Sequence, residues 1–141
     1  VGGGEFTAKE NKLMQTLGIT KQVAQRSLPD AEMSSAYCNA LFTVFPSRFE
    51  GFGLPALESM ASGTATLLAN ATSLPEVGGD AALYFESGNV ADLAEKMLTL
   101  ATGENLRTQL AKAGILQAKG FSWAKCATET AGVYQDTLNA R

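Results

Sequence analysis

The chain has 141 residues, a formal net charge of −3 and no histidine, a length that suits one domain with a substantial apolar core. The negative charge, with no Lys or Arg cluster to offset it, argues against a nucleic-acid surface, and no apolar run approaches the ~20 residues of a membrane span. Without histidine, Ser–His and Cys–His triads and the common zinc sites are excluded, so proton transfer must use carboxylates, Lys, Tyr or the substrate.

The chain begins with a pattern typical of the end of a strand. Val1–Gly4 reads as a strand tail and its exit loop, although the triple glycine lacks the spacing of a dinucleotide fingerprint. A strand end with no strand before it indicates that the chain starts partway through a longer protein. Thr7 and Glu10 then form a capping-box pattern, and Gly18 is expected to end the helix that follows.

The next segments alternate between strand and helix. Lys21 to Ser27 predicts a weak strand, and Asp30 is expected to cap a helix that continues to Ala40. Leu41 to Phe45 is the strongest strand of the chain, because an unbroken apolar run is typical of a parallel strand that is buried on both faces.

A loop from Pro46 to Leu54, called the glycine loop, follows this strand and leads into a helix predicted for Ala56 to Ser62. Pro55 suits the first turn of that helix, where its missing N–H costs nothing. The loop therefore leaves free N–H groups and a positive helix end at the carboxyl end of a strand, which suits an anionic or phosphorylated ligand. Gly51 and Gly53 are equally consistent with a tight turn that binds nothing.

The remaining elements complete a predicted α/β fold, a Rossmann-like parallel sheet with helices on both faces and further helices at the C-terminus. The segment 70–80, rich in turn residues, is expected to be a loop. The expected strands and helices are Thr64 to Ala69, Ala81 to Phe85, Asn89 to Thr102, Glu104 to Lys119 and a last helix capped by Ser122.

Two carboxylates bracket the glycine loop. Glu50 lies at its mouth, where a carboxylate can accept hydrogen bonds from sugar hydroxyls or balance developing positive charge; a solvated loop acid is the alternative. Glu58 is expected in the first turn of the helix, where the dipole favours any acid. A carboxylate near a bound nucleotide is also a common way to hold ribose hydroxyls.

Three further residues are expected to be buried. Trp123 opens the apolar stripe of the last helix and is predicted to belong to the core. Cys38 and Cys126 lie among apolar residues, and a pair of buried thiols is expected rather than a disulfide. With no signal peptide at the start, the expected location is the cytoplasm, where the full-length protein could also be peripheral to the membrane.

Several motifs together resemble the signature of the group 1 glycosyltransferases, retaining transferases of family four with two Rossmann-like domains. Glu50 and Glu58 have the spacing of that family's E-x7-E motif. The similarity covers nearly the whole chain, and this chain would be the C-terminal, donor-binding domain, residues 1–141. The matching stretches are Phe45-Pro46-Ser47, Glu50 to Pro55, Leu57-Glu58, Met60-Ala61, Gly63, Asn70, Ser73 to Val77, Gly79 to Ala82 and Phe121-Ser122-Trp123.

The resemblance assigns roles to individual residues. Glu50 would lie by the transferred sugar as the catalytic carboxylate, and Glu58 would hold the ribose hydroxyls. The loop around Ser27 and Leu28 would border the base. Backbone N–H groups would contact the sugar and the distal phosphate, and they belong to Gly51, Phe52, Gly53 and Leu54.

The implied reaction is transfer of a hexosyl group from a nucleoside diphosphate-sugar to an acceptor such as a growing polysaccharide or a glycolipid. It would need no metal and no cofactor, and no nucleic acid would be a partner. The alternative is a non-catalytic nucleotide-binding or interaction module with the same fold. In the family, an Arg and a Lys that clamp the diphosphate come from a strand-helix unit that would precede Val1, and the acceptor would bind the N-terminal domain, so the fragment alone is expected to be inactive.

The absence of that strand-helix unit also predicts how the strands pair. In a 3-2-1-4-5-6 sheet the first strand is central, so its loss separates the strand at Val23 from the strand at Leu41. Either these two strands pair directly, or the chain borrows a strand from a second copy, giving a homodimer by strand pairing or swapping.

Overall fold

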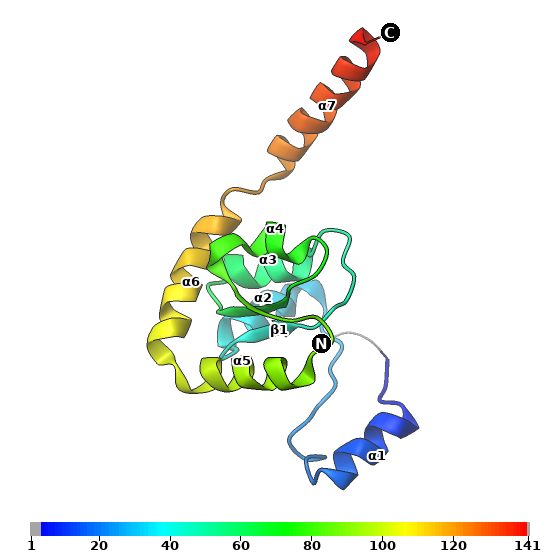
Figure 1. The fold of residues 1–141 in the computed structure, drawn as a ribbon, viewed down its shortest axis with the longest axis vertical. Helices are drawn as coiled ribbons and strands as arrows, with labels where there is room; N and C mark the ends of the chain where they lie inside the picture. The colour runs from blue at the N-terminus through cyan, green and yellow to red at the C-terminus, as the bar shows by residue number, and fades with distance from the viewer. Residues whose placement is uncertain (1–3, 141) are drawn as a thin grey trace. The chain divides into compact units, whose positions relative to one another are not determined.

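The structure is a computed structural model that describes residues 4–140 and is drawn in Figure 1. The chain forms two compact units, Val1–Ser35 and Ala36–Arg141, which are taken in turn. Helix α2, Asp30–Asn39, begins in the first and ends in the second.

The first unit contains helix α1, Ala8–Thr16, which confirms the predicted capping box. The Thr7 N–H donates to a Glu10 carboxylate oxygen at 2.7 Å, and the Glu10 N–H donates to Thr7 Oγ1 at 3.3 Å. The strand predicted for Lys21 to Ser27 is wrong, because this segment has no strand. Its side chains are mostly polar, so it offers little apolar surface to bury on the two faces of a sheet. The strand tail predicted at Val1 lies outside the described residues.

The second unit is built on a parallel sheet, which confirms the predicted fold class. Its strands are β1, Thr43–Phe45, β2, Thr66–Ala69, and β3, Leu83–Phe85, in the order β1-β2-β3. Val44 lies opposite Leu67, and Leu68 lies opposite Tyr84. All four residues of β2 are buried, and successive side chains of a strand point to opposite faces, so both faces of the sheet are covered.

Strand β1 is an edge strand among the residues that the structure describes. Its direct pairing with a strand at Val23 is therefore a wrong prediction, because the segment 21–27 is not extended into a ladder. Strand exchange with a second copy stays a prediction.

The helices of the second unit largely follow the expected boundaries. The exception is the segment 70–80, which was expected to be a loop but contains a helical turn and a 3₁₀ turn. Pro75 is the second residue of that helix, where no N–H is needed. The elements are α3, Leu54–Ala61, α4, Leu74–Gly78, η1, Gly79–Ala81, α5, Val90–Thr102, α6, Glu104–Ala118, and α7, Trp123–Asn139.

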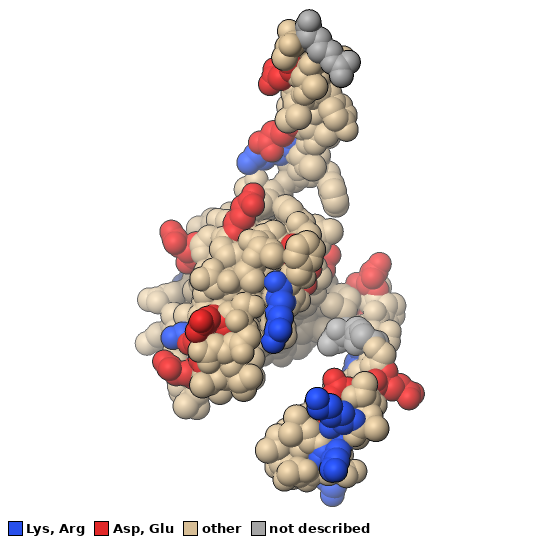
Figure 2. All heavy atoms as spheres, turned by 45° about the vertical axis from the view of Figure 1, so that its right-hand side comes forward, with Lys and Arg blue, Asp and Glu red and all other residues tan. Residues whose placement is uncertain are grey.

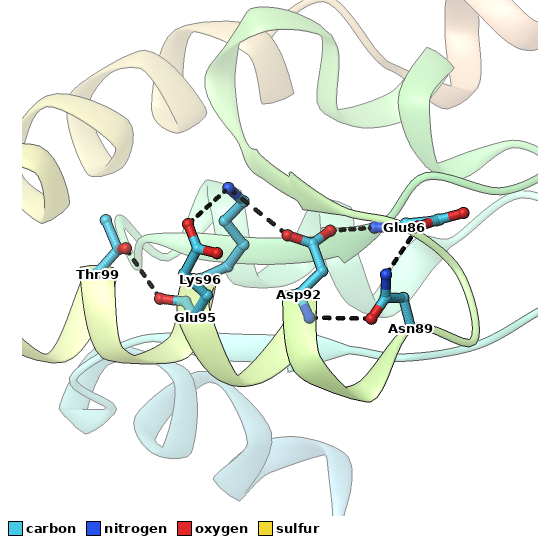
Figure 3. Close-up of polar contacts among 6 residues, drawn as sticks. All are labelled: Glu86, Asn89, Asp92, Glu95, Lys96 and Thr99. Atoms are coloured by element: carbon cyan, nitrogen blue, oxygen red, sulfur yellow. Dashed lines mark hydrogen bonds and ion pairs between the residues drawn. The ribbon is translucent and has the colours of Figure 1, made fainter.

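Helix α5 begins at a network of polar contacts, shown in Figure 3. Asn89 caps the helix by accepting a hydrogen bond from the Asp92 N–H at 3.1 Å. The Asp92 carboxylate accepts from the Glu86 N–H at 2.6 Å and forms an ion pair with Lys96 at 3.6 Å. These contacts fix the turn between β3 and α5.

Helix α6 packs directly on α3, the helix that follows the glycine loop. A Cβ at Gly114 would lie 3.3 Å from the Met60 Cβ, so the glycine lets the two helices approach closely. Gln117 Nε2 also donates to the Val77 carbonyl oxygen at 3.1 Å, which ties α6 to α4. The largest fully buried apolar side chains are Met60, Leu67, Leu68, Leu74, Val77 and Leu100.

Three predictions of burial are wrong, two of them for residues of the last helix and one for Cys38 on α2. Helix α7 has no buried residue among those described, and Trp123 is 77% exposed rather than part of the core. Cys38 and Cys126 are free but exposed. The apolar stripe of α7 has the spacing of a buried helix face, but no described element covers it, and spacing alone does not say what covers a face.

Tyr84 predicts a specific dependence of stability on alkaline pH. Its hydroxyl donates to the Gly79 carbonyl oxygen at 2.8 Å. Burial, and secondarily the Asp80 carboxylate, raise the pKa of Tyr84 to about 12 from its usual value of about 10. Because the folded-state pKa is raised, this stabilisation is complete below about pH 10 and is lost as the pH rises from about 10 to 12.

Urea unfolding at pH 8 and across pH 10 to 12 measures this effect. Tyr84→Phe should lower the free energy of unfolding at pH 8 by about 0.5–1.5 kcal/mol through the lost hydrogen bond, and it should flatten the alkaline loss. Some loss should remain, because burial, and secondarily Glu58, also raise the pKa of Tyr37. Tyr134→Phe, at a residue that is 67% exposed, is the matched control. An alkaline slope in Tyr84→Phe equal to that of the wild type would contradict the assignment.

Candidate functional site

The glycine loop connects the carboxyl end of β1 to the start of α3. Gly53 is the N-cap of α3 and has φ 99°, a left-handed conformation that favours glycine. A Cβ at Gly53 would also lie 3.0 Å from Leu74 Cδ2. Helix α3 starts at Leu54, two residues earlier than predicted, with Pro55 in its first turn as expected. The sequence therefore forces the chain to turn sharply at the end of the sheet.

Four successive N–H groups in this turn have no acceptor among the described residues. They belong to the residues that the resemblance assigned to the donor: Gly51, Phe52, Gly53 and Leu54. They lie at the positive end of the α3 dipole, where anions are stabilised. A Cβ at Gly51 would meet nothing within 4 Å, so packing within the described chain does not explain a glycine there.

The side chain of Phe52 packs against another aromatic ring, whereas its backbone N–H has no acceptor among the described residues. Its ring meets the ring of Phe121 edge to face, with centroids 5.9 Å apart and planes at 77°. Such a pair contributes about 0.5–1.5 kcal/mol beyond the area it buries. Because Phe121 lies just before α7, the segment between α6 and α7 helps to fix the glycine loop.

The backbone of Glu50 is held by two side chains from the loop after β2. The Glu50 N–H donates to Thr72 Oγ1 at 3.1 Å, and Ser73 Oγ donates to the Glu50 carbonyl oxygen at 3.0 Å. Thr72 has φ 49°, an unusual conformation for a β-branched residue that costs about 1–3 kcal/mol. Glu50 itself is half-buried, and its backbone is fixed on both sides, whereas its predicted role beside the sugar stays a prediction.

Sequence reasoning missed the roles of Thr72 and Ser73. The available signal was their position in the loop that follows a strand, because the carboxyl ends of parallel strands meet at one edge of a sheet. Glu50 follows β1 and Thr72 follows β2, and these strands are neighbours. Nothing in the residue types alone indicates which backbone groups they bind.

Glu58 lies on the exposed side of α3 but not in its first turn, which contains no acid. The prediction that Glu58 gains from the helix dipole at the first turn is therefore wrong, because α3 begins at Leu54. The carboxylate lies near Tyr37, where it adds to burial in raising the pKa of that phenol.

A buried cluster of hydroxyls locks α3 against the sheet next to Glu58. Ser59 Oγ lies 2.7 Å from Thr43 Oγ1 of β1 and 3.3 Å from Thr66 Oγ1 of β2. Thr66 Oγ1 also donates to the Thr64 carbonyl oxygen at 3.0 Å. Since buried polar groups that all have partners rigidify a core, Glu58 projects from a firmly held helix. Leu28 belongs to the first unit, and its contact with the base stays a prediction.

Acidic and basic side chains are unevenly represented on the surface of the second unit. On the face drawn in Figure 2, the second unit carries scattered Asp and Glu side chains and only isolated Lys or Arg side chains. That face has no basic tract of the kind that follows a nucleic-acid backbone. Within residues 4–140, no helix combines the length and apolar character that crossing a membrane requires.

Comparisons with known proteins point to one family. The family described as "Glycosyl transferases group 1" matches residues 1–117. The chain is 39% identical over 108 residues to the O-antigen chain mannosyltransferase B of Escherichia coli, an alignment that covers 77% of this chain and 28% of that protein. The chain thus spans well under half the length of this relative.

Solved structures agree with the fold. The C-terminal domain of a glycosyl transferase group 1 family protein from Francisella tularensis superposes with a TM-score of 0.70 at 28% identity, over 79% of this chain and 60% of that one. Sucrose-phosphate synthase from Thermosynechococcus elongatus superposes with a TM-score of 0.74 at 25% identity, over 93% of this chain and 34% of that one.

Proposed function

Since the chain belongs to the group 1 glycosyltransferases, we propose that it supplies the donor-binding part of an enzyme that transfers a hexosyl group from a nucleoside diphosphate-sugar. The observation that carries the proposal is the row of four N–H groups from Gly51 to Leu54 without acceptors, at the start of a helix and next to Glu50. A diphosphate and a sugar together offer the anionic and hydroxyl oxygens that such donors bind.

The reaction makes different demands on the loop and on the two acids. When the bond between the sugar and the diphosphate breaks, the leaving group gains negative charge, and fixed N–H dipoles stabilise that charge without reorganising. The N–H groups of the glycine loop are assigned to the distal phosphate and the sugar. Glu50 is assigned to the transferred sugar, where a carboxylate stabilises positive charge developing on the ring. Glu58 is assigned to the ribose hydroxyls.

The proposed mechanism retains the anomeric configuration by attack on the same face of the sugar that the leaving group departs from. The departing phosphate oxygen takes the proton of the acceptor hydroxyl as the new glycosidic bond forms. The transfer therefore needs no histidine of this chain, which has none. The acceptor is proposed to be a growing polysaccharide or a glycolipid, and mannose is the first sugar to test because the relative in Escherichia coli is named a mannosyltransferase.

Titration calorimetry of this chain with UDP, GDP and ADP tests the proposal. One of the three diphosphates should bind, and the matching nucleoside, which lacks the phosphates, should bind more weakly. Transfer from GDP-mannose, UDP-glucose or ADP-glucose by the complete enzyme would then identify the sugar. Binding of none of the three nucleotides would favour the rival function, an interaction module that keeps only the fold.

A further inference from the structure

Both peptide groups that flank the Glu50 side chain are held by hydroxyls from a different loop. Thr72 Oγ1 accepts from the Glu50 N–H at 3.1 Å, and Ser73 Oγ donates to the Glu50 carbonyl oxygen at 3.0 Å. One hydroxyl would leave the peptide free to rotate about a single contact. With its N–H and its carbonyl oxygen both bound, Glu50 has a hydrogen bond on each of the two peptide groups that flank its side chain.

The loop that supplies these hydroxyls is itself anchored. The Ala71 N–H donates to the Ala69 carbonyl oxygen of β2 at 2.8 Å. The Val77 N–H of α4 donates to the Ser73 carbonyl oxygen at 3.0 Å. Thr72 lies between these contacts with φ 49°, so its side chain is aimed by a backbone conformation that threonine rarely adopts.

The contact with Thr72 also separates a bound N–H group from the free N–H groups of the glycine loop. The Glu50 N–H is taken by Thr72, whereas the next four N–H groups have no acceptor among the described residues. The boundary between bound and free donors therefore falls at Glu50, so its contact with Thr72 sets where the row of free N–H groups begins.

We propose that Thr72 and Ser73 are positioning residues that orient the Glu50 carboxylate toward the transferred sugar. This inference rests on the proposed function of Glu50. Neither hydroxyl is assigned a contact with substrate; both act through the Glu50 backbone. A displacement of about 1 Å at a reacting centre can cost about 100-fold in rate, so loss of either contact affects kcat more than donor affinity.

Three variants distinguish a loss of the two Glu50 backbone contacts from a general loss of stability. Thr72→Val removes the hydroxyl and keeps the branched shape, Thr72→Ser keeps the hydroxyl, and Ser73→Ala removes the second contact. The matched control is Thr102→Val, because Thr102 Oγ1 donates to the Leu98 carbonyl oxygen on α5. Amide hydrogen exchange of Glu50 is measured in this chain, and kcat, the donor KM and Tm are measured in the complete enzyme.

The expected result is faster exchange at the Glu50 amide in Thr72→Val and a kcat about 10- to 100-fold lower. The donor KM should stay within about twofold, because the free N–H groups and Glu58 carry donor binding. Ser73→Ala should lower kcat in the same way. Thr72→Ser should restore both exchange and kcat, and Thr102→Val should resemble the wild type.

Unchanged exchange or unchanged kcat in Thr72→Val would overturn the positioning role. A fall in Tm that accompanies the fall in kcat, without rescue by Thr72→Ser, would also overturn it, because that pattern is merely structural. A wild-type enzyme that transfers no hexose from any donor overturns the proposed function. It also removes the expected effect of the Thr72 and Ser73 contacts on kcat. Amide exchange distinguishes the two failures, because it reports the contact without a donor.

Discussion

Replacing Glu50 with Ala in the complete enzyme should lower kcat about 100- to 1,000-fold, the loss typical of removing one fixed electrostatic partner of the transition state. The physical reason is that the sugar ring becomes positively charged as the leaving group departs, and a carboxylate held beside it stabilises that charge. The Glu50 backbone is fixed by Thr72 and Ser73, so the carboxylate needs little reorganisation during the reaction.

Steady-state kinetics with saturating donor measures this loss. Glu50→Gln keeps the shape and removes the charge, so its kcat should fall nearly as far if charge is the cause. Glu104→Ala, which removes an exposed acid at the start of α6, is the control and should turn over normally. Wild-type turnover in Glu50→Ala would refute the assigned role.

Replacing Glu58 with Ala should weaken donor binding about 10- to 100-fold while leaving kcat nearly unchanged. Hydrogen bonds to a charged group contribute about 1.5–3 kcal/mol, and the ribose lies away from the bond that breaks. An interaction equally strong in the ground state and the transition state changes KM without changing kcat. The helix should persist, since alanine has the highest helix propensity and Ser59 continues to hold α3 to the sheet.

Calorimetry with the preferred diphosphate and kinetics at saturating donor together measure this effect. The corresponding nucleoside diphosphate with deoxyribose provides the matched ligand control, because it lacks one of the hydroxyls that Glu58 is assigned to hold. Glu58→Ala should lose its preference for the ribose form. Equal affinity of wild type and variant, or a kcat that falls with Glu58→Ala as far as with Glu50→Ala, would contradict the assignment.

The sheet was predictable from the sequence because its strands are apolar runs bounded by turn residues. Leu41 to Phe45, Thr64 to Ala69 and Ala81 to Phe85 each contain one of the three strands. The strand expected from Lys21 to Ser27 failed, because a weak pattern in a mostly polar segment cannot outweigh the lack of a partner to pair with. The local sequence pattern therefore identified the strands whose apolar residues are buried, and it failed for the mostly polar segment.

Burial of the C-terminal helix could not be predicted from its periodicity. The stripe that begins at Trp123 has the spacing of a core face, yet Trp123 is 77% exposed. Periodicity shows that a helix has an apolar face, and it does not show which surface covers that face. The exposure of Cys126 on the same helix has the same cause.

The backbone conformation of the candidate site could be predicted from the sequence, but the side chains that bind the Glu50 backbone could not. The strand end, the glycines and Pro55 predict the turn and the free N–H groups, because each follows from local conformational rules. The contacts of Thr72 and Ser73 with Glu50 join residues more than twenty positions apart. Such contacts depend on the register of β1 against β2, which local patterns do not determine.

An NMR titration of this chain with UDP, GDP and ADP tests the central claim most directly, because it shows where a nucleotide binds. We expect the amide signals of Gly51, Phe52, Gly53 and Leu54 to shift with one nucleoside diphosphate, together with that of Glu58. The amide of Glu50, which already donates to Thr72, should shift less. Shifts confined to other parts of the chain, or no shift from Gly51 to Glu58 with any of the three nucleotides, would contradict the account.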